Sequence, residues 1–281
     1  MKEIRAIKKK MKGQNTTDGA GVKLVRTFGY HDTQDFDPFL LFDAFDSTNP
    51  SDYVKGFPWH PHRGIETITY LIEGIIEHGD SMGNTDHILA GDCQWMTAGS
   101  GIVHQEMPKP SKRLLGAQLW LNLPASNKMT KPKYRPILKK DIPVVADANS
   151  KVHVICGNFN NQKGAIQSDF VETLYLDVEL VENSEWILET KPDHTLFIYI
   201  VQGEAEFADV ASNVIDEKHI ILFSEGKKFI VKTKEKKIRF LLISGKPLKE
   251  PIAWGGPIVM NTREELDKAF EELDNNTFLK K

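Results

Sequence analysis

The stretch HPHRGIETITYLIEG, residues 60–74, contains the features on which both the fold and the function depend. β-branched and aromatic residues fill positions 67–72, and the run ends at Glu73-Gly74, which predicts a strand followed by a turn. Further apolar runs between polar turns have the same character: residues 197–201, 220–223, 229–231 and 238–243. Many short strands at short spacing predict an all-β fold of sandwiches or barrels.

A weak internal repeat divides the chain. Residues 70–74, YLIEG, resemble residues 199–203, YIVQG, and each is an apolar strand that runs into a glycine turn. Between them, residues 127–143 contain three prolines and many lysines, which interrupt the strand pattern and indicate a crossover. We therefore predict two β-barrels in one chain: a first at residues 1–130, a linker at 131–143 and a second at 144–281.

The clearest helix signal lies near the C-terminus. Thr262-Arg263-Glu264-Glu265 forms a capping box, in which the Thr hydroxyl and the Glu carboxylate can satisfy free backbone N–H groups. Apolar residues follow at helical spacing: Leu266, Ala269, Phe270 and Leu273. We expect one amphipathic helix packed on the outside of a sheet.

Composition excludes several classes of protein. The 281 residues contain 36 Lys+Arg and 39 Asp+Glu, a formal net charge of -3, which argues against general nucleic-acid binding. Two cysteines, Cys93 and Cys156, are too few for a disulfide scaffold or a thiolate zinc site. No run of eighteen apolar residues occurs, and no secretory signal is found. We expect a soluble cytoplasmic monomer that binds neither membranes nor nucleic acid directly.

Two pairs of residues carry the chemistry. Residues two apart on a strand point the same way, so His60 and His62 can both face inward, and so can His104 and Glu106. On neighbouring strands the two pairs place three imidazoles and one carboxylate around one point. This donor set suits one divalent first-row metal ion with positions left open for substrate or dioxygen. A closed structural zinc site would use more cysteine.

The carboxylate of this predicted site has a rival. If the strand continues without a bulge from His62, then Glu66, Ile68, Tyr70 and Ile72 share the imidazole face. Pro61 cannot donate a ladder hydrogen bond and Gly64 invites a bulge, so this continuity can fail. Spacing alone does not separate Glu66 from Glu106.

The motifs as a set resemble a known family. HPHRGIETITYLIEG, the later GDCQWMTAGSGIVHQEMP (residues 91–108), DPFLLFDAF (37–45) and GGPIVMNT (255–262) are closely similar to stretches of pirins, in the cupin superfamily. The resemblance implies a bicupin: two jelly-roll type cupin barrels, with iron in the N-terminal one. It implies His60, His62, His104 and Glu106 as the metal ligands and leaves Glu66 beside the site, whereas the general cupin pattern would choose Glu66.

The second barrel is expected to have no metal ligands. Aligning Tyr199 on Tyr70 places Glu189 and Lys191 where His60 and His62 stand, and a protonated lysine is a poor ligand.

The resemblance also implies a function, with alternatives. Some bacterial pirins are quercetinases, so we expect a dioxygenase that takes a flavonol such as quercetin and dioxygen, with Glu106 accepting the flavonol proton and carbon monoxide released on ring opening. Fe(II) is the first expectation for the metal, and Mn, Ni, Cu or Zn would also suit the donors. One alternative is a non-enzymatic regulator whose iron oxidation state alters the binding of a protein partner. Another is a cupin that acts on a different small substrate.

Overall fold

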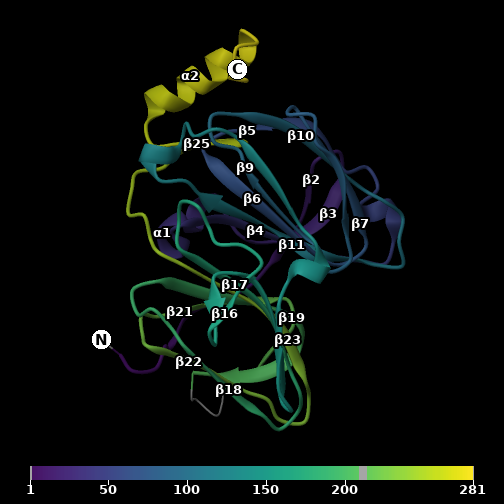
Figure 1. Ribbon diagram of the computed structural model, residues 1–281, viewed down its shortest axis with the longest axis vertical. Helices are drawn as coiled ribbons and strands as arrows, with labels where there is room; N and C mark the ends of the chain where they lie inside the picture. The colour runs from purple at the N-terminus through teal and green to yellow at the C-terminus, as the bar shows by residue number, and fades with distance from the viewer. Residues whose placement is uncertain (1, 209–213, 281) are drawn as a thin grey trace. The chain divides into compact units, whose positions relative to one another are not determined.

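The fold is all-β, as the strand pattern predicts. The computed structural model describes residues 2–208 and 214–280. It consists of two compact β units (Figure 1). The first barrel contains residues 14–139 and 248–281, and the second barrel contains residues 1–13 and 140–247. No helix among the described residues is both long enough and apolar enough to cross a membrane.

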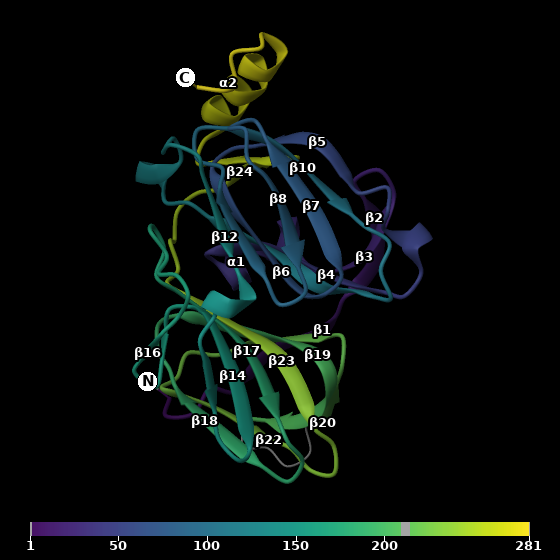
Figure 2. The same ribbon diagram turned by 45° about the vertical axis from the view of Figure 1, so that its right-hand side comes forward.

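The first barrel is built from two sheets. A seven-stranded sheet has the order β12-β9-β6-β11-β4-β3-β2, and a four-stranded sheet has the order β5-β10-β7-β8, which Figure 2 turns toward the viewer. The bounds are β2 Gln14–Asp18, β3 Val22–Phe28, β4 Phe39–Ser47, β5 Phe57–His62, β6 Ile65–Glu73, β7 Ile75–Asp80, β8 Thr85–Leu89, β9 Cys93–Thr97, β10 Ile102–Pro108, β11 Leu114–Asn122 and β12 Lys133–Ile137. A short helix, α1 Thr33–Phe36, precedes β4.

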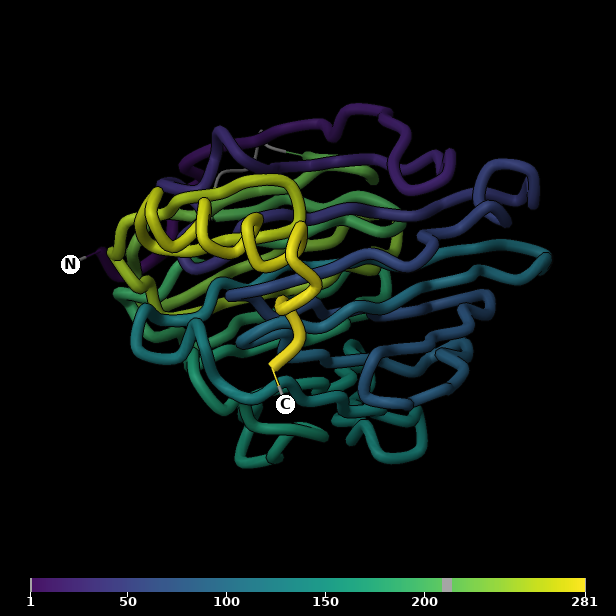
Figure 3. The backbone as a smooth tube through the Cα atoms, turned by 90° about the horizontal axis from the view of Figure 1, so that it is seen from above, coloured from purple at the N-terminus to yellow at the C-terminus, as the bar shows by residue number. Residues whose placement is uncertain are grey.

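The C-terminal segment belongs to this barrel. It forms a hairpin of β24 Ala253–Gly255 and β25 Ile258–Met260, and then α2 Arg263–Asp274, the yellow coil in Figure 3. The predicted capping box is present, since the Thr262 hydroxyl accepts from the Glu265 N–H and the Glu265 carboxylate accepts from the Thr262 N–H. Leu266 and Ala269 pack against Ile258 and Met260 of the hairpin strand.

The second barrel has one large sheet with the path β1-β21-β19-β23-β17-β14-β13, extended by β18, β20 and β22. The bounds are β1 Ile7–Lys12, β13 Val144–Ala146, β14 Ser150–Cys156, β15 Asn158–Phe159, β16 Gln162–Lys163, β17 Thr173–Leu180, β18 Glu185–Glu189, β19 Thr195–Phe207, β20 Val214–Asp216, β21 His219–Phe223, β22 Lys228–Lys232 and β23 Ile238–Gly245. Its interior is filled by apolar side chains, among them Trp186, Phe207, Phe229 and Phe240.

The boundaries predicted at 1–130, 131–143 and 144–281 differ from this division. The N-terminal strand β1 pairs with β21, with Met11 opposite Ile220, so it extends the second barrel. The expected linker contains β12, which pairs with β9 of the first barrel. The internal repeat marks the core strands of each barrel, but it contains no information about which barrel a flanking strand joins.

Candidate metal centre

Two paired strands bring the three predicted imidazoles together. In the antiparallel ladder of β5 and β10, His104 lies opposite His60, and Ile102 lies opposite His62. One ligating nitrogen from each histidine lies within 4.8 Å of the others. Nε2 of His60 and Nε2 of His62 are 3.1 Å apart. The alternation of side chains along both strands therefore produces the cluster that the spacing predicts.

The second ring nitrogens of two histidines are held by backbone carbonyls. Nδ1 of His60 lies 2.8 Å from the Pro58 oxygen, and Nδ1 of His62 lies 3.0 Å from the Pro257 oxygen. A carbonyl oxygen only accepts, so each Nδ1 carries a proton and the Nε2 atoms are the nitrogens that face each other. Metal-binding histidines are oriented in the same way.

The facing lone pairs fit a bound cation. Two nitrogens at right angles about one ion, each about 2.1 Å from it, stand about 3 Å apart, which matches the separation of the two Nε2 atoms. His104 supports the same conclusion, because both of its ring nitrogens are buried without a hydrogen-bond partner among the described residues. A buried polar atom without a partner is costly, and a metal ion would satisfy it.

Burial also sets the protonation state of these rings. Desolvation, together with the neighbouring His60, lowers the pKa of His62 to about 3. Desolvation and the adjacent histidines lower the pKa of His104 well below its ordinary value. Both rings are therefore neutral at pH 7, which is the form that binds a metal.

Glu106 lies close to the histidines but outside their group. It is buried on β10, opposite His78 of β7. Its Oε1 accepts from the Thr69 hydroxyl at 3.0 Å, and its Oε2 accepts from Nε2 of Gln118 at 2.8 Å. These two donors orient the carboxylate. The grouping of ligand atoms contains the three histidines and not Glu106.

Glu66 lies on the other face of its strand. β5 ends at His62 and β6 begins at Ile65, with Gly64 at a φ of +77° between them. Thr69 is the residue that contacts Glu106, so odd-numbered positions of β6 face the side on which Glu106 lies. Of the two alternatives, the interrupted face is therefore the one that forms, because the turn at Gly64 resets the alternation before Glu66. Glu66 instead accepts hydrogen bonds from Thr97 and Arg135.

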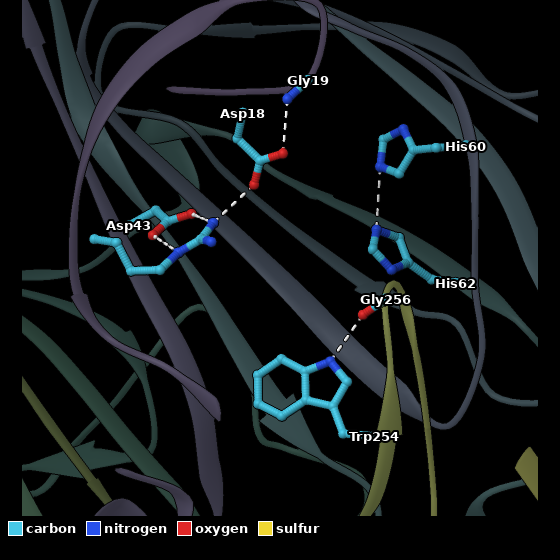
Figure 4. A network of polar contacts seen from close by, with 8 residues as sticks. Asp18, Gly19, Asp43, His60, His62, Trp254 and Gly256 are labelled. Carbon is cyan, nitrogen blue, oxygen red and sulfur yellow. Dashed lines mark hydrogen bonds and ion pairs between the residues drawn. The ribbon is translucent and has the colours of Figure 1, made fainter. Parts of the chain in front are cut away.

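A cavity of about 770 Å³ opens beside His60 and His62. Aromatic rings form much of its wall: the centroids of Trp120 and Trp254 are 5.8 Å apart, and those of Tyr30 and Trp254 are 5.5 Å apart. The Trp254 indole N–H donates to the Gly256 oxygen at 2.8 Å, which fixes the ring (Figure 4). The polar lining residues are Asp18, Arg26, Asp43 and Gln118, in addition to the two histidines.

Sequence reasoning missed the contribution of the C-terminal hairpin. Trp254 lines the cavity and Pro257 orients His62, yet both residues lie in the part of the chain that was assigned to the other barrel. The GGPIVMNT motif was the available signal, because its similarity to a pirin stretch was independent of its expected strand pairing. Arg26 and Trp120 had no signal of their own.

Two buried basic side chains attach the C-terminal segment to the residues beside the histidine cluster. Arg63 donates to the Ser100 and Phe278 oxygens and forms an ion pair with Glu272 at 2.8 Å. Lys128 donates to the Gly64 and Val259 oxygens, each at 2.8 Å, and to the Asn122 side chain. The residues directly after His62 are thereby bonded to the C-terminal segment.

Comparison with known proteins agrees with these features. The pirin family model matches residues 21–121, and the model of the pirin C-terminal cupin domain matches residues 175–279. A pirin-like protein of Caulobacter vibrioides is 41% identical over 98% of this chain and 99% of its own length. Human pirin is 38% identical over 92% of this chain and 89% of its own. The crystal structure of a quercetin 2,3-dioxygenase from Acinetobacter baumannii superposes with a TM-score of 0.89, at 33% identity and 98% coverage of both chains.

Proposed function

This chain belongs to the pirin family, and from that premise we propose that it is a metal-dependent dioxygenase that cleaves flavonols of the quercetin type. The observation that carries the proposal is the pair of Nε2 lone pairs of His60 and His62, which converge beside an aromatic cavity. A structural neighbour named quercetin 2,3-dioxygenase at 33% identity supports the reaction class.

His60, His62 and His104 would hold the ion, with Glu106 as the fourth ligand. Three imidazole nitrogens and one carboxylate suit Fe(II), which we propose as the resident metal, and the same donors accept Mn, Ni, Cu or Zn. When bound, the ion supplies Lewis acidity that lowers the pKa of a substrate hydroxyl.

The protein's own residues bind and orient the substrate. The rings of Trp120 and Trp254 offer flat apolar surfaces against which a planar ring system can pack. Glu106 is proposed to accept the proton of the reacting hydroxyl. Thr69 and Gln118 hold its two oxygens, so the orientation of this base is fixed before substrate arrives.

The test is anaerobic loading with Fe(II), confirmation of one metal per chain, and addition of quercetin and air. We expect loss of the flavonol absorbance and release of carbon monoxide, with neither in the metal-free protein. Glu106→Gln should lower kcat about 10²-fold or more, whereas Glu77→Gln, at a partly exposed glutamate of β7, serves as the matched control. Unchanged absorbance with metal confirmed in the site would rule the proposal out.

A second candidate function is a redox-sensing regulator that binds a protein partner. The observation in its favour is Trp59, which is 55% exposed and directly precedes His60 at the cavity. A change of metal oxidation state would therefore act next to an exposed aromatic residue. Oxidised and reduced protein should recover different amounts of partner in a pull-down, and Trp59→Ala should weaken both. Equal recovery in the two states would count against redox gating.

A further inference from the structure

Three charged residues, Asp18, Arg26 and Asp43, form a trio that lines the same cavity as His60 and His62. The Arg26 Nε lies 2.9 Å from Oδ1 of Asp43, and its Nη2 lies 2.7 Å from Oδ2 of Asp43 and 2.8 Å from Oδ2 of Asp18. Arg26 on β3 stands opposite Asp43 on β4, so the ladder itself sets this pairing. Figure 4 shows the two aspartates on one side and His60 and His62 on the other, with Trp254 below.

The guanidinium has donors left over. It carries five N–H groups, of which Asp43 and Asp18 take three. The remaining two are on Nη1, for which no acceptor lies within hydrogen-bond distance in the described part of the chain. The Arg26 side chain is 35% exposed and lines the cavity, so these donors are available to a ligand.

The charges of the trio select among ligands. One guanidinium and two carboxylates carry a formal charge of -1, which disfavours a carboxylate or phosphate group at this end of the cavity. A neutral hydroxyl avoids that repulsion. It can accept from Nη1 of Arg26, and a neighbouring hydroxyl can donate to Asp18, whose side chain is 49% exposed.

We propose that Arg26 and Asp18 form a subsite for adjacent phenolic hydroxyls of an uncharged, planar aromatic substrate, and that Arg26 determines specificity for them. The inference deepens the proposed function and rests on it for the placement of the reacting end at the histidines. The rings of Trp120 and Trp254 line the cavity that contains both groups, so the flat part of the same molecule contacts them. Asp43 acts as a positioning residue, because it is buried and holds the guanidinium in one plane.

The test compares quercetin with galangin, which lacks the two adjacent hydroxyls of the quercetin side ring. Dissociation constants are measured anaerobically by quenching of tryptophan fluorescence, with metal-free and metal-loaded protein. We expect the wild type to bind quercetin about tenfold more tightly than galangin, the size of one or two added hydrogen bonds to charged groups. Arg26→Lys and Asp18→Asn should each lower that ratio to about two or less.

Arg113→Lys is the matched control, because this partly exposed arginine also pairs with an aspartate of β4, Asp46, but does not line the cavity. It should keep the tenfold ratio. Asp18→Asn leaves the buried pair of Arg26 and Asp43 intact, so it remains informative if Arg26→Lys fails to fold. Retention of the wild-type ratio in Asp18→Asn, or no binding of either flavonol by the wild type, overturns the inference. Arg26-dependent and Asp18-dependent binding without turnover would contradict the dioxygenase alone.

Discussion

At the scale of single residues, His104 and His78 make a useful comparison. Both imidazoles are buried, and their ring centroids are 5.5 Å apart, but only His104 belongs to the group of three ligating nitrogens. His104→Ala should reduce bound metal from about one per chain to a small fraction, because one of three neutral nitrogen ligands is lost. His78→Ala leaves a void of the same size and should keep its metal. Elemental analysis of both variants after loading with metal measures this difference. Equal metal content in the two would show that His104 is not a ligand.

The buried Lys128 makes the free energy of unfolding depend on pH, and the direction of this dependence follows from its burial. Desolvation lowers the pKa of Lys128 to about 7, whereas in the unfolded chain it is about 10.4. Between these values the unfolded chain binds more protons than the native one, so the contribution of this group to stability rises with pH. The slope is at most about 1.4 kcal/mol per pH unit.

The measurement is urea unfolding of the wild type and of Lys128→Met at pH 7, 8 and 9. The free energy of unfolding of the wild type should rise relative to that of the variant as the pH increases. Parallel curves for the two proteins would mean that Lys128 keeps its proton throughout this range, held by its three oxygen acceptors.

At the scale of elements, the turn between β5 and β6 decides which side chains of β6 face the same side as the histidine cluster. A Cβ on Gly64 would lie 2.0 Å from the Val259 oxygen, and its backbone has a φ of +77°. Gly64→Ala should therefore cost about 2 kcal/mol or more, and it should weaken metal binding by displacing His62. Gly83→Ala is the control, because Gly83 also has a positive φ but nothing lies within 4 Å of the added atom. Chemical denaturation gives the loss in free energy of unfolding for each variant. Gly83→Ala measures the backbone cost alone, so the additional loss in Gly64→Ala is the steric cost. Equal losses in the two variants would contradict this account.

The same turn shows which features of the fold can be predicted from sequence patterns and which cannot. The strands at residues 67–72 and 238–243 were predicted correctly because their apolar, β-branched composition is a local property. Which face of β6 points toward the histidines stayed open, since Pro61 and Gly64 allow a bulge without fixing its register. The three histidines lie together because His60 and His62 are on one continuous strand and His104 is on the strand paired with it. Pro257 and Trp254 were missed as parts of the site because their contacts are with residues far away in the sequence: Pro257 accepts from His62, 195 residues earlier, and Trp254 packs near Trp120.

At the scale of the whole molecule, Arg63 joins the C-terminal segment to the first barrel. Its guanidinium is buried, lies 4.2 Å from the Phe278 ring centroid and pairs with Glu272. Arg63→Met should destabilise the protein by about 3 kcal/mol, because it leaves buried oxygens without donors. Hydrogen exchange should become faster in residues 253–278. Arg263→Met, on the exposed face of α2, is the control and should leave exchange unchanged. Unaltered protection in Arg63→Met would show that the hairpin and α2 pack independently of this residue.

The hydrogen bond from His62 to Pro257 spans 195 residues of sequence. During translation, at roughly 5–20 residues per second, about 10–40 s separate the synthesis of these two residues. From the synthesis of His104 onward the nascent chain contains all three histidines, but until Pro257 is made it lacks the carbonyl oxygen that accepts from His62 Nδ1. The site that we propose for a metal ion is therefore complete only after Pro257 has been synthesised, and a ribosome stalled upstream of Pro257 would display a His62 ring that is not yet oriented.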